Sequence, residues 1–153
     1  MRPAPKLTGS CAVLRLGGFV LACMLSTAVP AHAACPAAED LNAGMLQGHW
    51  QAELAATATS PAEVWQLELG PHPDYPGSLR GVLVQGRVRH PVAADLDDGE
   101  FTMEESHDGR RIAATWLGEV DAGSCAQLLR GVRQIGSGGL AAQGFVLRRQ
   151  SPR

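Results

Sequence analysis

Eight short runs of residues, separated by Gly, Pro, Asn or Asp, restrict what this chain can fold into. Runs of this length at regular spacing are typical of β-sandwiches and β-barrels. An eight-stranded meander tends to close on itself, because closure removes the exposed edges of the sheet. We therefore predict an all-β fold, an eight-stranded antiparallel up-and-down barrel, with strands over residues 46–55, 63–70, 78–85, 87–96, 100–106, 111–120, 125–133 and 141–149.

Alternation within the runs indicates which face of each strand is buried. In the first run, Trp50, Ala52 and Leu54 lie at every second position, with polar residues between them. The second run repeats this pattern with Trp65 and Leu67. Successive side chains of a strand point to opposite faces of the sheet. Each strand is therefore expected to have one apolar side and one polar side.

Two Asp-Gly pairs predict the register of the central strands. Asp98-Gly99 and Asp108-Gly109 are typical of two-residue type I′ hairpin turns. Both turns direct the same face of residues 100–106 inward, and a slip by one residue would reverse that face. The expected pairs are Leu96 with Phe101 and Ala94 with Met103 in the first hairpin, and His107 with Arg110, Glu105 with Ile112, Met103 with Ala114 and Phe101 with Trp116 in the second.

The N-terminal segment has the features of a secretory signal. Arg2, Lys6 and Arg15 place positive charge before the apolar run 16–29, which is too short to span a bilayer. The small residues of Ala31-His32-Ala33 then suit a signal peptidase. We expect cleavage after residue 33.

This leader predicts both the domain organisation and the location of the protein. We expect residues 1–33 to be a signal peptide and residues 34–153 to be a single β-barrel domain, with a short helix or arm over 37–45 before the first strand. The location would be the periplasm or the exterior of a bacterial cell. Residues 20–23, Val-Leu-Ala-Cys, resemble a lipobox, so a lipoprotein is the second interpretation.

Cysteines and charge restrict the mature chain further. Only Cys35 and Cys125 remain after cleavage, and in an oxidising compartment they can form one intramolecular disulfide. The mature chain has ten arginines and fifteen acidic residues, a net charge of −5. Nucleic acid is therefore not an expected partner, since phosphate binding needs a clustered positive surface.

Chemically reactive residue types gather at 104–108, but their arrangement does not favour catalysis. Glu104 and Glu105 are neighbours on a strand and point to opposite faces. The histidines show no metal-ligand spacing, although the two registers bring His90 opposite His107 at one end of the barrel. That pair has two interpretations, a metal site or a hydrated rim. We expect no cofactor, no metal and no enzymatic activity, with a weak hydrolase as the least supported class.

Glu105 is of interest because its register places a carboxylate on the apolar face, between Val92 and Ile112. A buried carboxylate needs a partner, and Arg149, which shares a face with Leu147, is the candidate. The alternative is that both side chains lie near the ends of the barrel and are hydrated.

Two short motifs resemble known families. Gly48-His49-Trp50 in the first strand and Arg148-Arg149 in the last resemble the calycin pattern of lipocalins and avidins, in which a basic residue packs over the tryptophan ring. Leu46-x-Gly48-x-Trp50 is also similar to the small bacterial inhibitors of secreted metalloproteases. In those inhibitors an N-terminal arm enters the protease cleft. Here a Cys35–Cys125 disulfide, expected to join the arm to the seventh strand, would tether it.

Two functions follow from a barrel of this size, whose interior is either filled by side chains or holds one small ligand. The first is the binding of a small apolar or amphipathic ligand, and the second is interaction with a protein target through the N-terminal arm and loops, especially residues 71–76. A ligand-sized apolar cavity would favour the first function, and a filled interior with a rigid exposed loop would favour the second. The candidate ligand-binding residues are Trp50, Trp65, Phe101, Met103, Glu105, Trp116 and Arg149.

Overall fold

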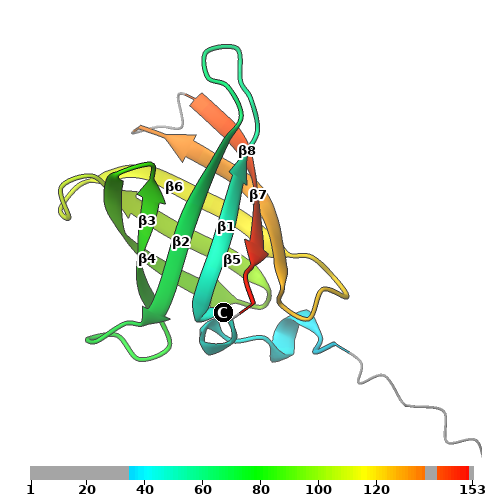
Figure 1. Cartoon of the computed structure of the whole chain (residues 1–153). Helices are drawn as coiled ribbons and strands as arrows, with labels where there is room; N and C mark the ends of the chain where they lie inside the picture. The colour runs from blue at the N-terminus through cyan, green and yellow to red at the C-terminus, as the bar shows by residue number, and fades with distance from the viewer. Residues whose placement is uncertain (1–34, 137–140, 152–153) are drawn as a thin grey trace, which may run out of the picture. The chain divides into compact units, whose positions relative to one another are not determined.

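The computed structural model describes residues 35–136 and 141–151, which include all of the predicted strands. The predicted signal peptide, residues 1–33, lies outside the described residues. Eight antiparallel strands form a closed barrel in up-and-down order, which confirms the predicted fold class (Figure 1). Each strand pairs with the next one, and β8 pairs with β1 to close the barrel. The strands are β1 (Gly48–Leu54), β2 (Glu63–Pro71), β3 (Leu79–Gln85), β4 (Val88–Asp97), β5 (Glu100–Ser106), β6 (Ile112–Val120), β7 (Leu128–Ile135) and β8 (Ala141–Arg149).

For residues 37–45, where we predicted a short helix or an arm, the structure has no continuous helix. This segment forms two short 3₁₀ turns, η1 (Ala38–Asp40) and η2 (Ala43–Leu46), because Leu41 between them is extended with ψ of 144°. This break lets the side chains of Leu41 and Leu46 both enter the core. The first strand consequently begins at Gly48 rather than at residue 46.

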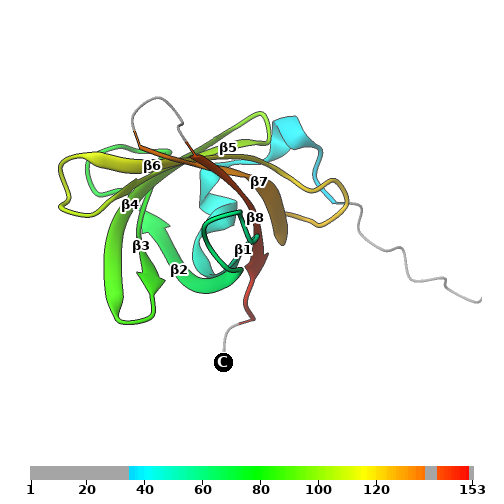
Figure 2. The same cartoon turned by 90° about the horizontal axis from the view of Figure 1, so that it is seen from above.

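The turn η2 covers one end of the barrel, which we call the near end. η2 contacts β2 and β4, and in the view along the barrel it lies within the outline of the strands (Figure 2). Leu46 has no exposed surface, and its carbonyl accepts a hydrogen bond of 2.8 Å from the indole Nε1 of Trp50. The end at which β1 finishes and β2 begins is called the far end.

Cys35 and Cys125 form the predicted disulfide at the near end, with their Cα atoms 4.7 Å apart. We expected Cys125 to lie on the seventh strand, but it does not. It lies in the connection before β7 and has a φ of 51°, a left-handed conformation that does not continue a strand. The bridge therefore joins the N-terminal segment to the β6–β7 connection.

The two predicted hairpin registers have different outcomes. The pairs Leu96–Phe101 and Ala94–Met103 between β4 and β5 are confirmed. The register between β5 and β6 is wrong by two residues, because residues 107–111 form a longer loop and the ladder is irregular at Glu105 and Ser106. The observed pairs include Glu105 with Ala114, Met103 with Trp116 and Phe101 with Gly118, in place of Glu105 with Ile112, Met103 with Ala114, Phe101 with Trp116 and the His107–Arg110 pair.

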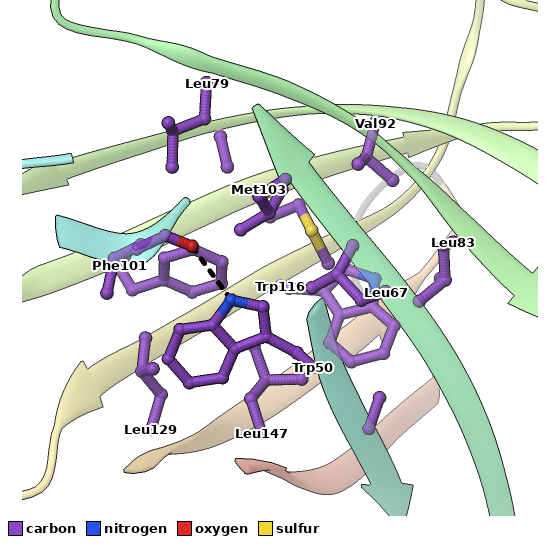
Figure 3. Packing of buried hydrophobic residues seen from close by; sticks show 14 of the residues in the cluster. Trp50, Leu67, Leu79, Leu83, Val92, Phe101, Met103, Trp116, Leu129 and Leu147 are labelled. Carbon is purple, nitrogen blue, oxygen red and sulfur yellow. Dashed lines mark hydrogen bonds between the residues drawn. The ribbon is translucent and has the colours of Figure 1, made fainter. Parts of the chain in front are cut away.

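The shift of two residues preserves the inside face of both strands. Phe101, Met103 and Trp116 all point into the core, where they surround Trp50 together with leucines from other strands (Figure 3). Leu129 rather than Leu128 is the inward residue of β7. Gly118 is required beside this cluster, since a Cβ there would lie 2.5 Å from the backbone carbonyl oxygen of Arg130 and 2.9 Å from the ring of Phe145.

Candidate functional site

The middle of the barrel is filled by its own side chains. Trp50, Met103 and Trp116 have no exposed surface and Phe101 has 1% (Figure 3). A side chain with no accessible surface touches neither solvent nor an internal void that holds a water molecule. These four predicted ligand-binding residues are therefore packed core residues in this structure, and a ligand among them would have to displace side chains.

Arg149, another predicted ligand-binding residue, lies at the near end and not beside Glu105. Its guanidinium is 5.5 Å from the centre of the Trp50 ring and donates hydrogen bonds to the carbonyls of Met45 and Gln47. A basic residue of the last strand thus packs over the tryptophan, as the sequence resemblance implies. Its role in this structure is to hold η2 against the barrel.

Glu105 has Arg133 of β7 as its partner, which corrects the predicted pairing with Arg149. Arg133 Nε donates to Glu105 Oε2 at 2.9 Å and Arg133 Nη2 donates to Oε1 at 3.0 Å, a bidentate pair. Trp116 Nε1 donates to Glu105 Oε2 at 3.1 Å. Glu105 is completely buried rather than hydrated. It lies opposite Val92, as expected, and Ile112 is exposed.

Aromatic rings surround the arginine of this pair. The guanidinium carbon of Arg133 lies 4.9 Å from the Trp65 ring centre and 5.6 Å from the Trp116 ring centre. Burial alone would raise the pKa of Glu105, but the hydrogen bonds and charge of Arg133 outweigh burial and hold that pKa below its ordinary value. The carboxylate therefore stays ionised inside the barrel.

Two histidines complete this group at the far end. The rings of His90 and His107 have their centres 4.7 Å apart, so the predicted proximity is confirmed. His107 Nε2 is 3.3 Å from Glu105 Oε1, and its side chain is largely exposed. His90 is buried, and neither of its ring nitrogens has a hydrogen-bond partner in the described part of the chain. Burial lowers the pKa of His90. We call His90, Glu105, His107 and Arg133 the far-end cluster.

Trp65 is the predicted ligand-binding residue that borders this cluster. Its indole Nε1 donates to Glu63 Oε2 at 2.7 Å, and Gln85 Nε2 donates to the same oxygen at 3.0 Å. These two hydrogen bonds lower the pKa of Glu63. Gln143 of β8, also buried at this end, donates to the carbonyl of Ala55. The far end therefore combines a buried indole, 5% exposed, with several fixed polar groups.

Sequence reasoning missed Arg133 and Gln143. Arg133 lies four positions after Leu129, so period-two alternation places the two side chains on the same face. The direction of Leu129 could not be decided from the sequence, because the Ala122-Gly123 turn gave no register. Gln143 shares a face with Phe145 and Leu147 in the same way.

The loop between β2 and β3 is ordered by its own contacts. His72 Nδ1 accepts hydrogen bonds from the backbone N–H groups of Asp74 and Tyr75, and the His72 and Tyr75 rings are 4.7 Å apart. The loop is closed by a backbone bond of 3.0 Å from His72 N–H to the Ser78 carbonyl. Tyr75 is 64% exposed. The loop thus presents a fixed aromatic ring to the surroundings.

A hollow of about 340 Å³ lies on the outer wall beside this loop. We call it the outer hollow. It is bordered by the loop residues His72 and Asp74, and by side chains of β3, β4, β5 and the 107–111 loop that include Arg80, Pro91, Glu104 and Arg111.

Comparison with known proteins gives no match. No protein-family model, curated protein or solved structure matches this chain. Within the described ranges, no helix has the length and apolar character needed to cross a membrane. The arrangement contains two candidate binding regions. One is the exposed loop with the outer hollow, and the other is the far-end cluster beside Trp65, which is buried except for His107.

Proposed function

We propose that this protein is an exported, non-enzymatic barrel that binds a protein partner through the loop at residues 71–76 and the outer hollow. The observation that supports it is the combination of a filled interior with a rigid, exposed loop. The prolines and internal hydrogen bonds of the loop fix its conformation, so little conformational entropy would be lost on binding.

Tyr75 is the proposed anchor of this interaction. Tyrosine is enriched among the residues that dominate interface energetics, because it combines a large apolar ring with a polar tip. The outer hollow beside it would receive polar side chains of the partner, with Arg80 and Arg111 supplying donors. Export and the disulfide fit a partner met outside the cytoplasm.

Site-specific photo-crosslinking tests this proposal. A crosslinking residue placed at position 75 should give one discrete heavier species in the exporting host. The matched control is position 64, because Val64 is exposed to a similar degree, 59%, on the outer face of β2 and away from the loop. The same products from both positions, or no product from either, would contradict the proposal. Crosslinking at position 75 identifies the partner. That partner should co-purify with the unaltered protein and not with a Tyr75→Ala variant.

A second candidate function is the binding of a small amphipathic molecule at the far end. The observation in its favour is Trp65, whose ring borders the far-end cluster with Arg133 against it. The fixed hydrogen-bonding groups there would orient a polar head. The Trp65 indole, which is 5% exposed, would contact an apolar part after neighbouring side chains move aside. Native mass spectrometry of protein from its own host should show a retained mass that is lost in Trp65→Ala and kept in Tyr75→Ala. Absence of any retained mass would count against this function.

A further inference from the structure

We propose that His90, His107 and Glu105 form a binding site for one divalent transition-metal ion of the Zn²⁺ type. The inference goes beyond both proposed functions, since it needs neither a protein partner nor an organic ligand. The potential ligand atoms of these three residues all lie within 4.8 Å of one another. They come from β4, from β5 and from the loop that follows β5.

His90 provides the independent observation that points to a ligand. Its side chain is 6% exposed, and both of its ring nitrogens are buried without a hydrogen-bond partner among the described residues. Buried polar groups in folded proteins nearly always have a partner, so such a group needs an explanation. The His90 ring lies against the His107 ring rather than in a purely apolar environment. A metal ion between the two imidazoles would supply a partner for one of the two His90 nitrogens.

One ligand ring has to move for the site to accept an ion, because the three ligand atoms are separated by up to 4.8 Å. Zinc–nitrogen and zinc–oxygen bonds are about 2.0–2.2 Å, so the ligand atoms of a tetrahedral site lie about 3.3–3.5 Å apart. His107 Nε2 and Glu105 Oε1 are already 3.3 Å apart. His107 lies in the 107–111 loop with an exposed side chain, so its ring can rotate toward His90. Water would complete the coordination.

The rest of the far-end cluster supports a metal ligand at Glu105. Arg133 and Trp116 hold the carboxylate in one orientation, which is the role of outer-sphere partners around metal sites. The arginine charge opposes a nearby cation, while the carboxylate charge attracts it. Two imidazoles and one carboxylate suit Zn²⁺ and Cu²⁺, whereas Ca²⁺ and Mg²⁺ prefer sites made entirely of oxygen ligands.

Isothermal titration calorimetry of the chelator-treated full chain tests the proposal. Zn²⁺ should bind with a stoichiometry of one, and Ca²⁺ and Mg²⁺ should give no heat of binding. His107→Ala should weaken Zn²⁺ binding by more than about 100-fold, the upper range for losing only an outer-sphere partner. His49→Ala is the matched control, because His49 is an exposed histidine on the outer face of β1. It should bind Zn²⁺ as the unaltered chain does.

His90→Ala should also abolish binding, but this variant removes a buried ring and its folding has to be checked by thermal unfolding without metal. His107→Ala avoids that difficulty because His107 is on the surface. Co²⁺ substitution gives a second readout, the visible absorption of a tetrahedral site, which should be absent in both variants. The proposal is overturned if the unaltered chain binds no Zn²⁺ at micromolar protein, or if His107→Ala binds it unchanged.

Discussion

At the scale of single residues, the pair formed by Glu105 and Arg133 places two opposite charges inside the barrel. Both side chains are buried, and each satisfies the charge of the other. Desolvating two charges offsets much of their attraction, so the pair adds little net stability. Removing one member is different, because it leaves an uncompensated charge in an apolar environment.

Arg133→Met should therefore destabilise the protein by about 3–5 kcal/mol. The double variant Glu105→Leu/Arg133→Met removes both charges and should recover most of that loss. Urea unfolding of the two variants and the unaltered chain measures the difference. Equal destabilisation by the single and the double variant would show that the unpaired charge of Glu105 is not the cause of the lost stability.

Glu63 provides a pH-dependent signal at the same scale. Its pKa is below the ordinary 4.5 because the carboxylate accepts hydrogen bonds from Trp65 and Gln85. A depressed pKa means that these hydrogen bonds stabilise the fold above the unfolded-state pKa, and that the stabilisation is lost as pH falls through the folded-state pKa. The Trp65 indole N–H resonance in an NMR titration should shift with a midpoint below pH 4.5. The shift should vanish in Glu63→Gln, and a midpoint above 4.5 would contradict the assignment.

At the scale of elements, two similar turn sequences behave differently, and this explains what sequence reasoning could and could not predict. In Asp98-Gly99 both residues have positive φ, 47° and 84°, as a type I′ turn requires. In Asp108-Gly109 only the glycine does. Asp108 Oδ1 instead accepts hydrogen bonds from the backbone N–H groups of Arg110 and Arg111, each at 2.9 Å. This side-chain turn lengthens the loop and shifts the register.

The elements of the barrel were predictable because they depend on local alternation and turn residues. All eight strands overlap their predicted ranges, and the inside face of β5 was predicted correctly despite the wrong register with β6. The partner of Glu105 was not predictable in the same way. The partner depends on which side chains of β7 point into the interior near Glu105. The register of β7 determines those side chains, and the sequence did not predict that register.

The contacts of Arg149 in β8 with the η2 segment give a prediction at this scale. Arg149→Met removes two hydrogen bonds to the carbonyls of Met45 and Gln47 and the contact with Trp50, and should cost about 2–3 kcal/mol. Arg148→Met is the matched control, because that neighbouring arginine forms an exposed ion pair with Glu53. Exposed pairs contribute less than about 1 kcal/mol. Chemical unfolding compares the two variants. Equal losses in the free energy of unfolding would contradict a stabilising role for the Arg149 contacts.

At the scale of the whole molecule, the disulfide and the barrel ladder hold the chain together in different ways. Cys35 and Cys125 are 90 residues apart, so the bridge closes a long loop of the unfolded chain. The chain-entropy model gives an upper limit of about 4–5 kcal/mol for such a loop. The ladder between β1 and β8 closes the barrel without help from the bridge.

The variant Cys35→Ser/Cys125→Ser should therefore remain folded but unfold at lower denaturant concentration, by up to about 4–5 kcal/mol. Hydrogen exchange should increase most around residues 35–41, which the bridge ties to the β6–β7 connection. Reduction of the unaltered chain should reproduce the effect. Complete loss of far-ultraviolet β signal in the variant would show that the barrel depends on the bridge.

The pairing of the first strand with the last also dictates when this barrel can form. Trp50 lies opposite Arg149, so the final ladder needs residues from the two extremes of the domain. When only the first seven strands have been synthesised, both edges of the sheet are unpaired. The barrel can consequently close only after β8 has been synthesised, because β1 has no partner on that side until then.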